Sequence, residues 1–547
     1  MLWNILNQKT VSTTEQLLKV ILANRKIGDI DLFLNPPSPL EITPKQLKIS
    51  STQLKKALAR IKTAITTQQK VLIYGDYDAD GITATSILWL TFIKLGLVAI
   101  PFIPDRLKHG YGLSIKALKE ILDAHQPDLI ITVDNGIVAN DALEWLKEQR
   151  VDVIVTDHHQ PSKEKIHALA TVHSTKVSGA TVAWMLAKEL SPSYAKKLLG
   201  LVTISTIADA MRLVDENRSI VKHGLELMRK QQRPGIKALL DVAGINTSEV
   251  DVGTIGFALA PRINAAGRIS QGLMAVRLLC TEDEISAKKI ANKLNSLNQQ
   301  RQDLTSSQLE EADRQAQEHP EQPLIIASSP TFHEGIIGLL SGRLTEKYFK
   351  PSIVIASGGE VSKASARSVS GVSITNLIRK VEELLLSVGG HELAAGFSVK
   401  TSELEKVKNR LLKLAREEIN ANLLQPSVKI DAVICANLIK PSTVKKLDQL
   451  RPLGLGNREP VLMIKQLKID DYRSLGKYKE HLKFLLSAVD DDSQAQFEAV
   501  GWRMGERLEE VQPGEIIDLV GVIEINSWNG RQTAQVKIKD FRASLQV

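Results

Sequence analysis

Cysteine is almost absent from this chain, which has 547 residues and only two cysteines, Cys280 and Cys435. Two thiols cannot form a disulfide framework, and they are too few for a zinc or iron–sulfur site built from cysteines. Such sparse usage is typical of proteins kept in a reducing compartment. We therefore expect a cytoplasmic protein.

Long apolar runs and aromatic residues are also lacking. No uninterrupted run of 18 apolar residues occurs, so we expect no membrane span. The first residues, Met1–Asn4, do not begin a basic region followed by a long apolar run, which argues against a signal peptide. Aromatic residues make up 4% of the chain, which argues against broad platforms for base stacking.

Positive charge is in mild excess. The formal net charge is +8 and the isoelectric point is about 9.1, which suits a polyanionic partner better than an acidic one. The chain is also longer than a single hydrophobic core supports, so we expect two to four domains.

The most informative motif is Tyr-Gly-Asp-Tyr-Asp-Ala-Asp-Gly at residues 74–81, directly after an apolar stretch. We expect this run to be extended, so that Asp76, Asp78 and Asp80 project from one face. Three carboxylates on one face repel each other unless a cation lies among them. Hard divalent cations such as Mg²⁺ or Mn²⁺ favour these oxygen ligands. A solvated acidic turn is the alternative interpretation.

Apolar runs alternate with helical patterns after residue 68. This alternation predicts a mostly parallel sheet with crossover helices, whose reactive groups gather at the carboxyl ends of the strands. The strands are expected at Val71–Tyr74, Leu97–Phe102, Leu129–Val133 and Val151–Thr156, and the helices at Thr83–Leu95, Ile115–Ala124 and Asn140–Gln149.

Later strand ends of the same block carry further candidate metal ligands. Asp134 follows one strand, and Asp157-His158-His159 follows the next. We also expect Ile204–Ile207 to form a strand that ends beside Asp209. Carboxylates mixed with imidazole favour Mn²⁺ or Mg²⁺ over a calcium cage or a thiolate zinc site. A buried structural histidine is the alternative for His158.

The pattern divides the chain into five parts. We expect an N-terminal helical segment at 1–68, a catalytic α/β domain at 69–280, a long charged connector helix at 281–318, a smaller α/β domain at 319–425, and a β-barrel of the oligonucleotide-binding type at 426–547. The fold class is therefore α/β and multidomain.

Asp157-His158-His159, together with the acidic motif, resembles the DHH phosphoesterases, and within them the bacterial exonucleases specific for single-stranded DNA. The resemblance covers nearly the whole chain. Its further motifs are Asp105-Arg106, Gly110–Gly112, Thr132–Gly136, Ile207–Asp209, Leu259–Arg268, Leu297–Arg301, His333–Gly338, Ser365–Ser368, Gly389–Gly396, Leu453–Asn457 and Glu459-Pro460.

Three stretches depart from the family pattern. The loop near His173–Gly179 is shortened, Ala210–Leu213 differs after Asp209, and Arg458 stands where a proline is usual. None of these departures removes a candidate metal ligand, but they affect the expected path of the substrate.

The resemblance implies a DHH domain, a connector helix, a DHH-associated domain and a C-terminal barrel that together hydrolyse single-stranded DNA from the 5′ end, in DNA repair and recombination, and release 5′-mononucleotides. It implies two Mn²⁺ or Mg²⁺ ions, with Asp134 bridging them. The metal ligands that it implies are Asp76, Asp78, Asp80, Asp134, His158 and Asp209, of which Asp76 matches least closely. His159 and Asp157 are the expected catalytic residues; His159 contacts the scissile phosphate or shuttles a proton, with support of a ligand as the alternative.

The resemblance also implies a grip on the 5′-phosphate by the second α/β block, where arginine forks and small neighbours suit a phosphate. We expect Gly389–His391 to offer backbone N–H groups, and Tyr111 to stack on a base or to serve packing. The candidate substrate-binding residues are Arg106, Tyr111, Arg262, Arg268, Ser365, Arg367, Ser368, Gly390 and His391.

Two other functions compete with the exonuclease. One is a DHH phosphodiesterase for short oligoribonucleotides or cyclic dinucleotides, against which the β-rich residues 427–547 argue. The other is an inert relative that serves as a replication scaffold, against which the complete ligand set argues. We expect a monomer that acts on single-stranded DNA with a 5′-phosphate, alongside a single-strand-binding protein and a helicase.

Overall fold

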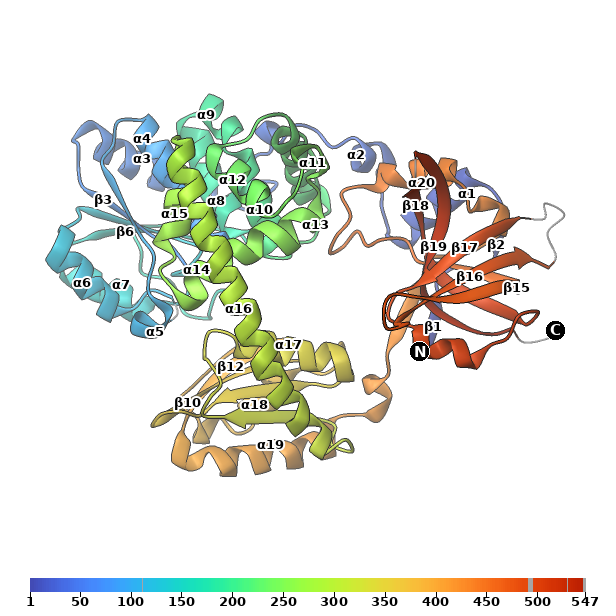
Figure 1. Cartoon of the computed structure of the whole chain (residues 1–547). Helices are drawn as coiled ribbons and strands as arrows, with labels where there is room; N and C mark the ends of the chain where they lie inside the picture. Colours follow the sequence, from blue (N-terminus) through green and yellow to red (C-terminus); the bar gives the residue numbers. More distant parts are fainter. Residues whose placement is uncertain (111, 490–494, 529, 545–547) are drawn as a thin grey trace. The chain divides into compact units, whose positions relative to one another are not determined.

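The computed structural model describes residues 1–110, 112–489, 495–528 and 530–544. The chain forms two compact units (Figure 1). One consists of residues 38–211 and 223–425. The other combines residues 1–37, 212–222 and 426–547. No helix in the described part of the chain is both long enough and apolar enough to cross a membrane.

A five-stranded parallel sheet organises the first α/β domain, as the sequence predicted. The spatial order is β4-β3-β5-β6-β7, and the strands are nearly continuous apolar runs because helices cover both faces. Its strands are β3 (Val71–Tyr74), β4 (Ala99–Phe102), β5 (Leu129–Val133), β6 (Asp152–Asp157) and β7 (Ala170–His173).

Helices α6 and α7 close one apolar core with Leu72, Ile130 and Val155 of the sheet. Helices α4, α8 and α10 pack on one another, and α4 and α8 also contact the strands. The helices of this domain are α3 (Ser51–Thr66), α4 (Ala79–Lys94), α5 (Arg106–His109), α6 (Ile115–His125), α7 (Asn140–Glu148), α8 (Gly179–Leu190), α9 (Pro192–Lys197) and α10 (Leu199–Ala208). More helices follow: α11 (Asp215–Lys230), α12 (Pro234–Val242), α13 (Val252–Thr254), a π-helical turn at Ile255–Leu259, α14 (Ala260–Ile269) and α15 (Leu273–Cys280).

Two expectations about the acidic segments are wrong. The run of three aspartates is not extended, because Asp78 caps helix α4 and Asp80 already lies in its first turn. Ile204–Ile207 belongs to helix α10, which ends at Asp209, and not to a strand. The continuous apolar run of α10 suits a buried strand or a buried helix equally well, and periodicity cannot distinguish them.

A single helix, α16 (Glu284–Glu318), follows the first domain, close to the predicted connector. It packs against α12, α14 and α15 at one end and against α17 and β8 at the other (Figure 1). Residues 38–211 and 223–425 therefore form one unit through this helix.

The second α/β domain has a mixed sheet in the order β11-β12-β10-β9-β8, in which only β8 and β9 run parallel. Apolar cores lie on both of its faces. Its elements are β8 (Ile325–Ser329), α17 (Ile337–Tyr348), β9 (Ser352–Ala356), β10 (Val361–Arg367), α18 (Ile374–Arg379), β11 (Ser387–His391), β12 (Ala394–Lys400) and α19 (Leu404–Glu418).

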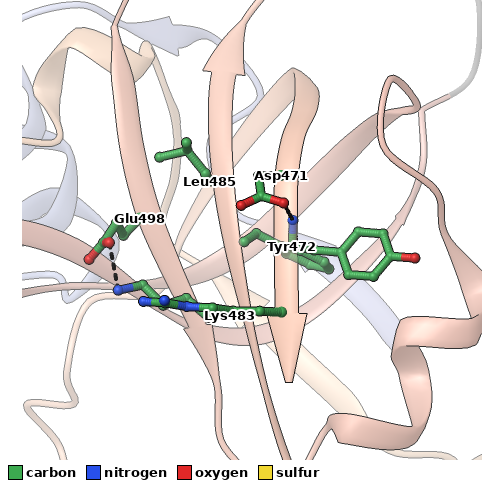
Figure 2. A pocket seen from close by; sticks show the side chains of 7 residues that line it. Asp471, Tyr472, Lys483, Leu485 and Glu498 are labelled. Atoms are coloured by element: carbon green, nitrogen blue, oxygen red, sulfur yellow. Dashed lines mark hydrogen bonds and ion pairs between the residues drawn. The ribbon is translucent and has the colours of Figure 1, made fainter. Parts of the chain in front are cut away.

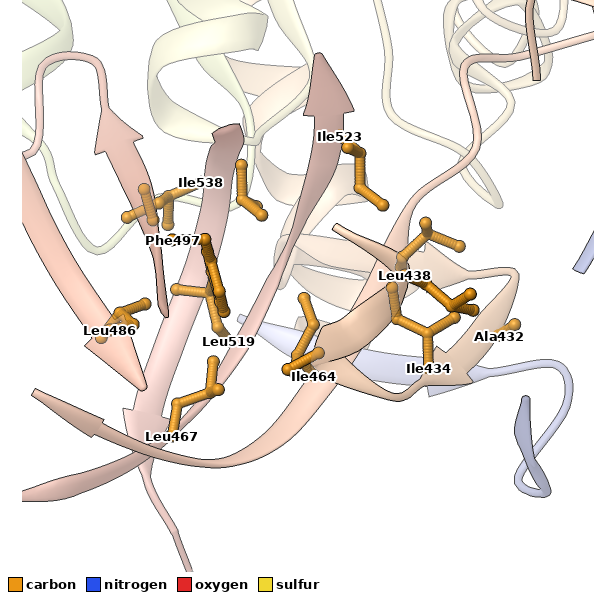
Figure 3. Close-up of a cluster of buried hydrophobic side chains, with 14 of the residues drawn as sticks. Ala432, Ile434, Leu438, Ile464, Leu467, Leu486, Phe497, Leu519, Ile523 and Ile538 are labelled. Atoms are coloured by element: carbon orange, nitrogen blue, oxygen red, sulfur yellow. The ribbon is translucent and has the colours of Figure 1, made fainter. Parts of the chain in front are cut away.

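The C-terminal strands close into a five-stranded barrel, since each pairs with two others in the ring β15-β16-β17-β19-β18. Figure 3 shows part of its core, where Leu467, Leu519 and Phe497 meet. The strands are β15 (Leu462–Leu475), β16 (His481–Ala488), β17 (Gln496–Gly501), β18 (Ile516–Trp528) and β19 (Arg531–Ala543).

The N-terminus joins this barrel unit. The sequence predicted a mostly helical segment at 1–68, and its first residues instead form two short strands. Strand β1 (Leu2–Ile5) pairs in parallel with β13 (Ser427–Ile430). Strand β2 (Thr10–Val11) pairs with β14 (Ala432–Ile434). The remaining elements of this unit are α1 (Thr14–Asn24), α2 (Ile30–Leu34) and α20 (Pro441–Leu447). The domain boundaries drawn from the sequence stay predictions.

Candidate metal centre and phosphate-binding residues

Seven candidate ligands gather at the carboxyl edge of the parallel sheet. They form overlapping groups whose ligand atoms lie within 4.8 Å of one another. The groups are Asp76-Asp78-Asp134, Asp80-His158-Asp209 and Asp134-His158-His159. Asp134 and His158 each belong to two of these groups. Of the two, the Asp134 carboxylate has two oxygens, which suits a ligand shared by two cations.

Asp134 is held in an unusual position. It follows β5 with φ of +62°, a left-handed conformation that is uncommon for any residue other than glycine. Its side chain is only 2% exposed, and Oδ1 lies 3.2 Å from His158 Nε2 without an aligned hydrogen bond to any described residue. A buried carboxylate oxygen without a hydrogen-bond partner is costly. The chemistry of this atom therefore fits a cation.

The N-terminus of helix α8 holds the carboxylate of Asp80 in place. The backbone N–H groups of Gly179 and Ala180 both donate to the Asp80 carboxylate at 2.7 Å, and Ser205 Oγ donates at 2.5 Å. A helix N-terminus stabilises negative charge through its free N–H groups and its dipole. These hydrogen bonds fix the position of the Asp80 carboxylate, with Oδ2 3.5 Å from His158 Nε2.

Gly179 also leaves room for Asp134. A Cβ atom added at Gly179 would lie 2.6 Å from Asp134 Oδ1, closer than side chains tolerate. Gly179→Ala should therefore displace Asp134 and weaken Mn²⁺ binding about 10- to 100-fold, as measured by isothermal titration calorimetry. Gly342→Ala is the matched control, since a Cβ there meets nothing within 4 Å. Unchanged Mn²⁺ affinity in Gly179→Ala would contradict this geometry.

The acidic loop is fixed at its other end by helix α14. Asp78 caps α4 by accepting from the N–H groups of Asp80 and Gly81. Asn264 Oδ1 accepts from Ala79 N–H at 2.7 Å. The approach of α14 requires glycine at position 267, because a Cβ there would lie 2.0 Å from the carbonyl oxygen of Tyr77.

Mutual repulsion dominates the electrostatics of the centre. Burial, and then the charges of Asp80 and Asp78, raise the pKa of Asp134 well above its ordinary value. The same causes raise the pKa of Asp209 to about 8. Burial and the charge of Asp78 raise the pKa of Asp76. Carboxylates this crowded are stable as anions only with cations among them. The donor set therefore fits Mn²⁺ or Mg²⁺.

His159 and Asp157 form a separate pair. Asp157 Oδ1 lies 2.8 Å from His159 Nδ1 and also accepts from the N–H groups of His158 and His159, while Oδ2 accepts from Ile137 N–H. Burial alone would lower the pKa of His159, but the hydrogen bond and charge of Asp157 raise it to about 9. Asp157 thus orients the His159 ring and favours its protonated form.

The shortened loop supports the same pair. His173 Nε2 lies 2.7 Å from the carbonyl oxygen of His159. His158 itself faces Asp80, Asp134 and Asp209 with its two ring nitrogens. Burial lowers the pKa of His158, which favours the neutral imidazole that binds metals.

Two arginines of the first α/β domain lie near the acidic loop. The guanidinium of Arg106 lies 5.2 Å from the ring centroid of Tyr77 in that loop. Arg268 is half-buried and donates to the carbonyl oxygen of Gly335 at 3.0 Å. Burial, and then the charges of Arg106 and Arg301, lower the pKa of Arg268 to about 10.

The start of helix α17 lies against strand β10. There, Ser365 and Arg367 form a second group of side chains that can donate hydrogen bonds to a phosphate. A Cβ added at Gly338 would lie 3.1 Å from Ser365 Oγ and 3.5 Å from an Arg367 guanidinium nitrogen. Burial and the charge of Arg106 lower the pKa of Arg367. The charge of Arg106 thus acts on both Arg268 and Arg367, and Arg367 and Ser365 lie close to Gly338 in the first turn of α17.

The other candidate substrate-binding residues are less closely grouped. Arg262 donates to Asn295 Oδ1 on helix α16 and to the carbonyl oxygen of Ala258. The Ser368 hydroxyl donates to Val372 at 2.7 Å. Gly390 and His391 lie in edge strand β11 and not in a turn. Tyr111 lies outside the described residues.

Sequence reasoning missed several residues that shape the centre. They are Gly179, Ser205 and Asn264, which hold Asp80 and the acidic loop, and Arg301, which interacts with Arg268. Asn264 and Arg301 already lie in the motifs Leu259–Arg268 and Leu297–Arg301, so the motifs carried a signal. Ser205 carried none, because a lone serine in an apolar run is unremarkable.

The barrel carries a small polar trough on β15, β16 and β17 (Figure 2), with a volume of about 220 Å³. Its ion pair joins Lys483 Nζ to Glu498 Oε1 at 2.5 Å. His481, two residues before Lys483 on β16, packs edge-on against Trp502 with ring centroids 4.8 Å apart, and Trp502 is 54% exposed. The trough is lined by Asp471, Tyr472, Arg473, Lys483, Phe484, Leu485 and Glu498.

Crowded carboxylates at a parallel-sheet edge, beside arginine forks from a second α/β domain, define a metal-dependent phosphoesterase of the DHH class. Three family descriptions match in the corresponding order: the DHH family, N-terminal domain, at residues 70–208, the DHHA1 domain at 321–421, and the RecJ OB domain at 430–540.

Sequence comparison with known proteins gives the same class. The chain is 35% identical to the single-stranded-DNA-specific exonuclease RecJ of Bacillus subtilis over 89% of its own length and 63% of that protein. It is 33% identical to the RecJ of Thermus thermophilus over 89% of its own length and 70% of that protein. The chain therefore spans somewhat less than two thirds of the Bacillus protein. It belongs to the RecJ family of single-stranded-DNA-specific exonucleases, which confirms the recognition made from its motifs.

Solved structures show the same fold. The crystal structure of Thermus thermophilus RecJ in complex with Mn²⁺ has a TM-score of 0.84 and 28% identity, covering 100% of this chain and 80% of that one. A structure of the same protein in complex with Mg²⁺ has a TM-score of 0.77 and 26% identity, over 100% and 79%. The predicted fold class is thus confirmed, and homologous structures hold Mn²⁺ or Mg²⁺.

Proposed function

We propose that this chain is a metal-dependent exodeoxyribonuclease that degrades single-stranded DNA in the 5′-to-3′ direction and releases 5′-mononucleotides. The observation that carries the proposal is the position of Asp134, shared between two ligand groups at the sheet edge. Two Mn²⁺ or Mg²⁺ ions held by Asp76, Asp78, Asp80, Asp134, His158 and Asp209 would supply an activated water and neutralise charge on the phosphate.

The residues of the chain itself position the substrate. His159, kept protonated at neutral pH by Asp157, is placed to contact an oxygen of the scissile phosphate or to pass on a proton. Arg106, Arg268, Arg367 and Ser365 would hold the 5′-terminal phosphate. The charges of Arg106 and Asp76, and of Arg268 and Asp78, influence each other, and Arg106 also influences Arg367. These interactions support cleavage next to a bound 5′ end.

The barrel favours a long single strand, and not a short oligoribonucleotide, as the substrate. Arg473 and Lys483 with the exposed Trp502 suit a nucleic-acid strand, since bases stack on aromatic rings and phosphates pair with cations. We further propose a cytoplasmic monomer that works with a single-strand-binding protein and a helicase in DNA repair and recombination. The free cysteines support the location. An inert scaffold is disfavoured by the complete ligand set.

The test is digestion of 3′-labelled single strands that carry either a 5′-phosphate or a 5′-hydroxyl, in Mn²⁺. Wild type should remove nucleotides from the 5′ end, and Arg367→Gln should lower kcat/KM about 10- to 100-fold for the phosphorylated strand only, since a charge-assisted hydrogen bond is lost. Arg379→Gln, an exposed change in the same domain, is the control. Trimming from the 3′ end would refute the polarity, and equal loss on both strands would refute the phosphate site.

A further inference from the structure

Helix α5 begins at Arg106 and ends at His109, whose ring is buried. The His109 side chain is 6% exposed, whereas the side chain of its neighbour Lys108 is 55% exposed. A helix of four residues forms few hydrogen bonds of its own, so its position depends on contacts with the rest of the domain. The buried ring of His109 is the part of α5 that can supply such contacts.

The two nitrogens of the His109 ring contact different segments. Asp105 N–H donates to His109 Nδ1 at 2.9 Å, and His109 Nε2 lies 3.2 Å from Glu120 Oε2 on helix α6. Because the backbone N–H is a donor, Nδ1 is unprotonated and Nε2 carries the proton that is donated to Glu120. The ring of Phe102, at the end of β4, lies 6.0 Å from the imidazole ring, centroid to centroid. His109 therefore joins the start of α5 to helix α6 and packs against the end of β4.

Two exposed lysines add weaker contacts between α5 and α6. Lys108 Nζ lies 2.7 Å from Glu120 Oε2, and Lys116 Nζ donates to the carbonyl oxygen of Lys108 at 2.9 Å. Hydrogen bonds, first from Lys108 and then from His109, lower the pKa of Glu120 and so keep its carboxylate an acceptor. Exposed ion pairs contribute little to stability, whereas a partly buried N–H group that loses its acceptor is costly. The His109 ring is therefore the main link between α5 and α6.

Arg106 is the residue whose place depends on this link. Its guanidinium lies 5.2 Å from the ring centroid of Tyr77, which stands between two candidate metal ligands in the acidic loop. Beyond α5 the chain is held again, since the Tyr74 hydroxyl at the end of β3 donates to the carbonyl oxygen of Gly112 at 3.0 Å. The segment that carries Arg106 is thus held next to β3, the strand that leads into the acidic loop.

We propose that His109 is a positioning residue: by joining α5 to α6, it places Arg106 for the 5′-terminal phosphate of the substrate. This inference rests on the proposed function, in which Arg106 binds that phosphate. A guanidinium that is already in place loses less conformational freedom when the phosphate binds. His109 therefore acts on the affinity for the substrate and not on the chemical step.

The test removes the two hydrogen bonds of the ring one at a time. His109→Asn keeps an acceptor at the position of Nδ1 but loses the contact with Glu120. His109→Gln keeps a donor near the position of Nε2 but loses the acceptor for Asp105 N–H. His109→Ala loses both.

Steady-state digestion of 3′-labelled strands in Mn²⁺ measures the effect. KM for a 5′-phosphorylated strand should rise about 10-fold in His109→Ala and about 3-fold in each of the other two variants, with kcat within about 2-fold of wild type. KM for a 5′-hydroxyl strand should stay within about 2-fold, since it lacks the phosphate that Arg106 contacts. His319→Asn, at a histidine that is 71% exposed, is the control and should alter neither constant.

A double-mutant cycle shows whether His109 acts through Arg106. On the phosphorylated strand, His109→Ala should add less than about 2-fold to the KM of Arg106→Gln, because the residue that His109 positions is already gone. Losses that multiply in the double variant would overturn the proposal. An equal rise in KM for both strands in His109→Ala would do the same.

Hydrogen exchange separates this inference from the nuclease assignment. Amide exchange in peptides that cover residues 104–110, followed by mass spectrometry, should be faster in His109→Ala than in wild type, whether or not DNA is digested. Unchanged exchange would overturn the link between α5 and α6. Faster exchange in a protein whose wild type does not digest strands from the 5′ end would refute only the proposed function.

Discussion

Asp134→Asn should lower kcat on single-stranded DNA by about 1000-fold or more, because the amide keeps the shape of the side chain but removes the charge shared between two ligand groups. A single-turnover digestion assay in saturating Mn²⁺ measures the loss. Asp123→Asn, at an exposed position on α6, is the control and should leave the rate unchanged.

Asp134→Asn lowers the rate, but it should stabilise the protein in the absence of metal. Asp134 is repelled by Asp80 and Asp78, so replacing its charge should raise the melting temperature of the metal-free protein and reduce the stabilisation that added Mn²⁺ provides. A variant that retained wild-type kcat would contradict the shared-ligand position. One that lost activity and also melted lower without metal would show disrupted folding instead.

Removal of metal should abolish digestion and make stability fall as pH rises. The carboxyl groups of Asp134, Asp76 and Asp209 have folded-state pKa values raised above their unfolded values, with Asp209 at about 8. The folded state therefore binds more protons than the unfolded state above about pH 4, and stability declines until pH passes the folded pKa values. His159, raised to about 9, acts in the same direction between about pH 6.5 and 9.

Metal reverses this dependence, because ligands must lose their protons to bind it. The melting temperature of the chelated protein should fall from pH 6 to pH 9, whereas the rise produced by Mn²⁺ should grow over the same range. Differential scanning calorimetry at matched ionic strength measures both. A chelated protein that melts higher at pH 9 than at pH 6 would contradict the repulsion among these carboxylates.

The sequence alone was enough to predict that the candidate ligands at the ends of strands lie close together. Asp134 and Asp157-His158-His159 follow apolar runs whose spacing predicts parallel strands, and parallel strands share one carboxyl edge. The motifs then supplied the family. Resemblance assigned Asp209 to the centre, and the structure places it in one ligand group with Asp80 and His158. The predicted strand before it was wrong, because a uniformly apolar helix such as α10 has no face that distinguishes it from a strand.

Contacts between distant segments could not be predicted in the same way. Gly179 and Ser205 reach Asp80 from 99 and 125 residues away, and nothing in their local sequence indicates that partner. The pairing of β1 with β13 also escaped prediction, because a four-residue strand with partly exposed side chains gives little periodic signal. Such features are decided by tertiary packing.

The pairing of Leu2 with Ser427 makes residues 2–5 wait for residues 427–430 during synthesis. Arg218 must also wait for a later segment, since its guanidinium lies over Phe33 and donates to the carbonyl oxygens of Leu450 and Pro452. The barrel unit therefore assembles from residues 1–37, 212–222 and 426–547 only after the ribosome has made the third of these stretches. Pairing between segments this far apart in the sequence slows folding. A bulky fusion at the N-terminus would therefore hinder folding of the barrel unit and leave the metal centre intact.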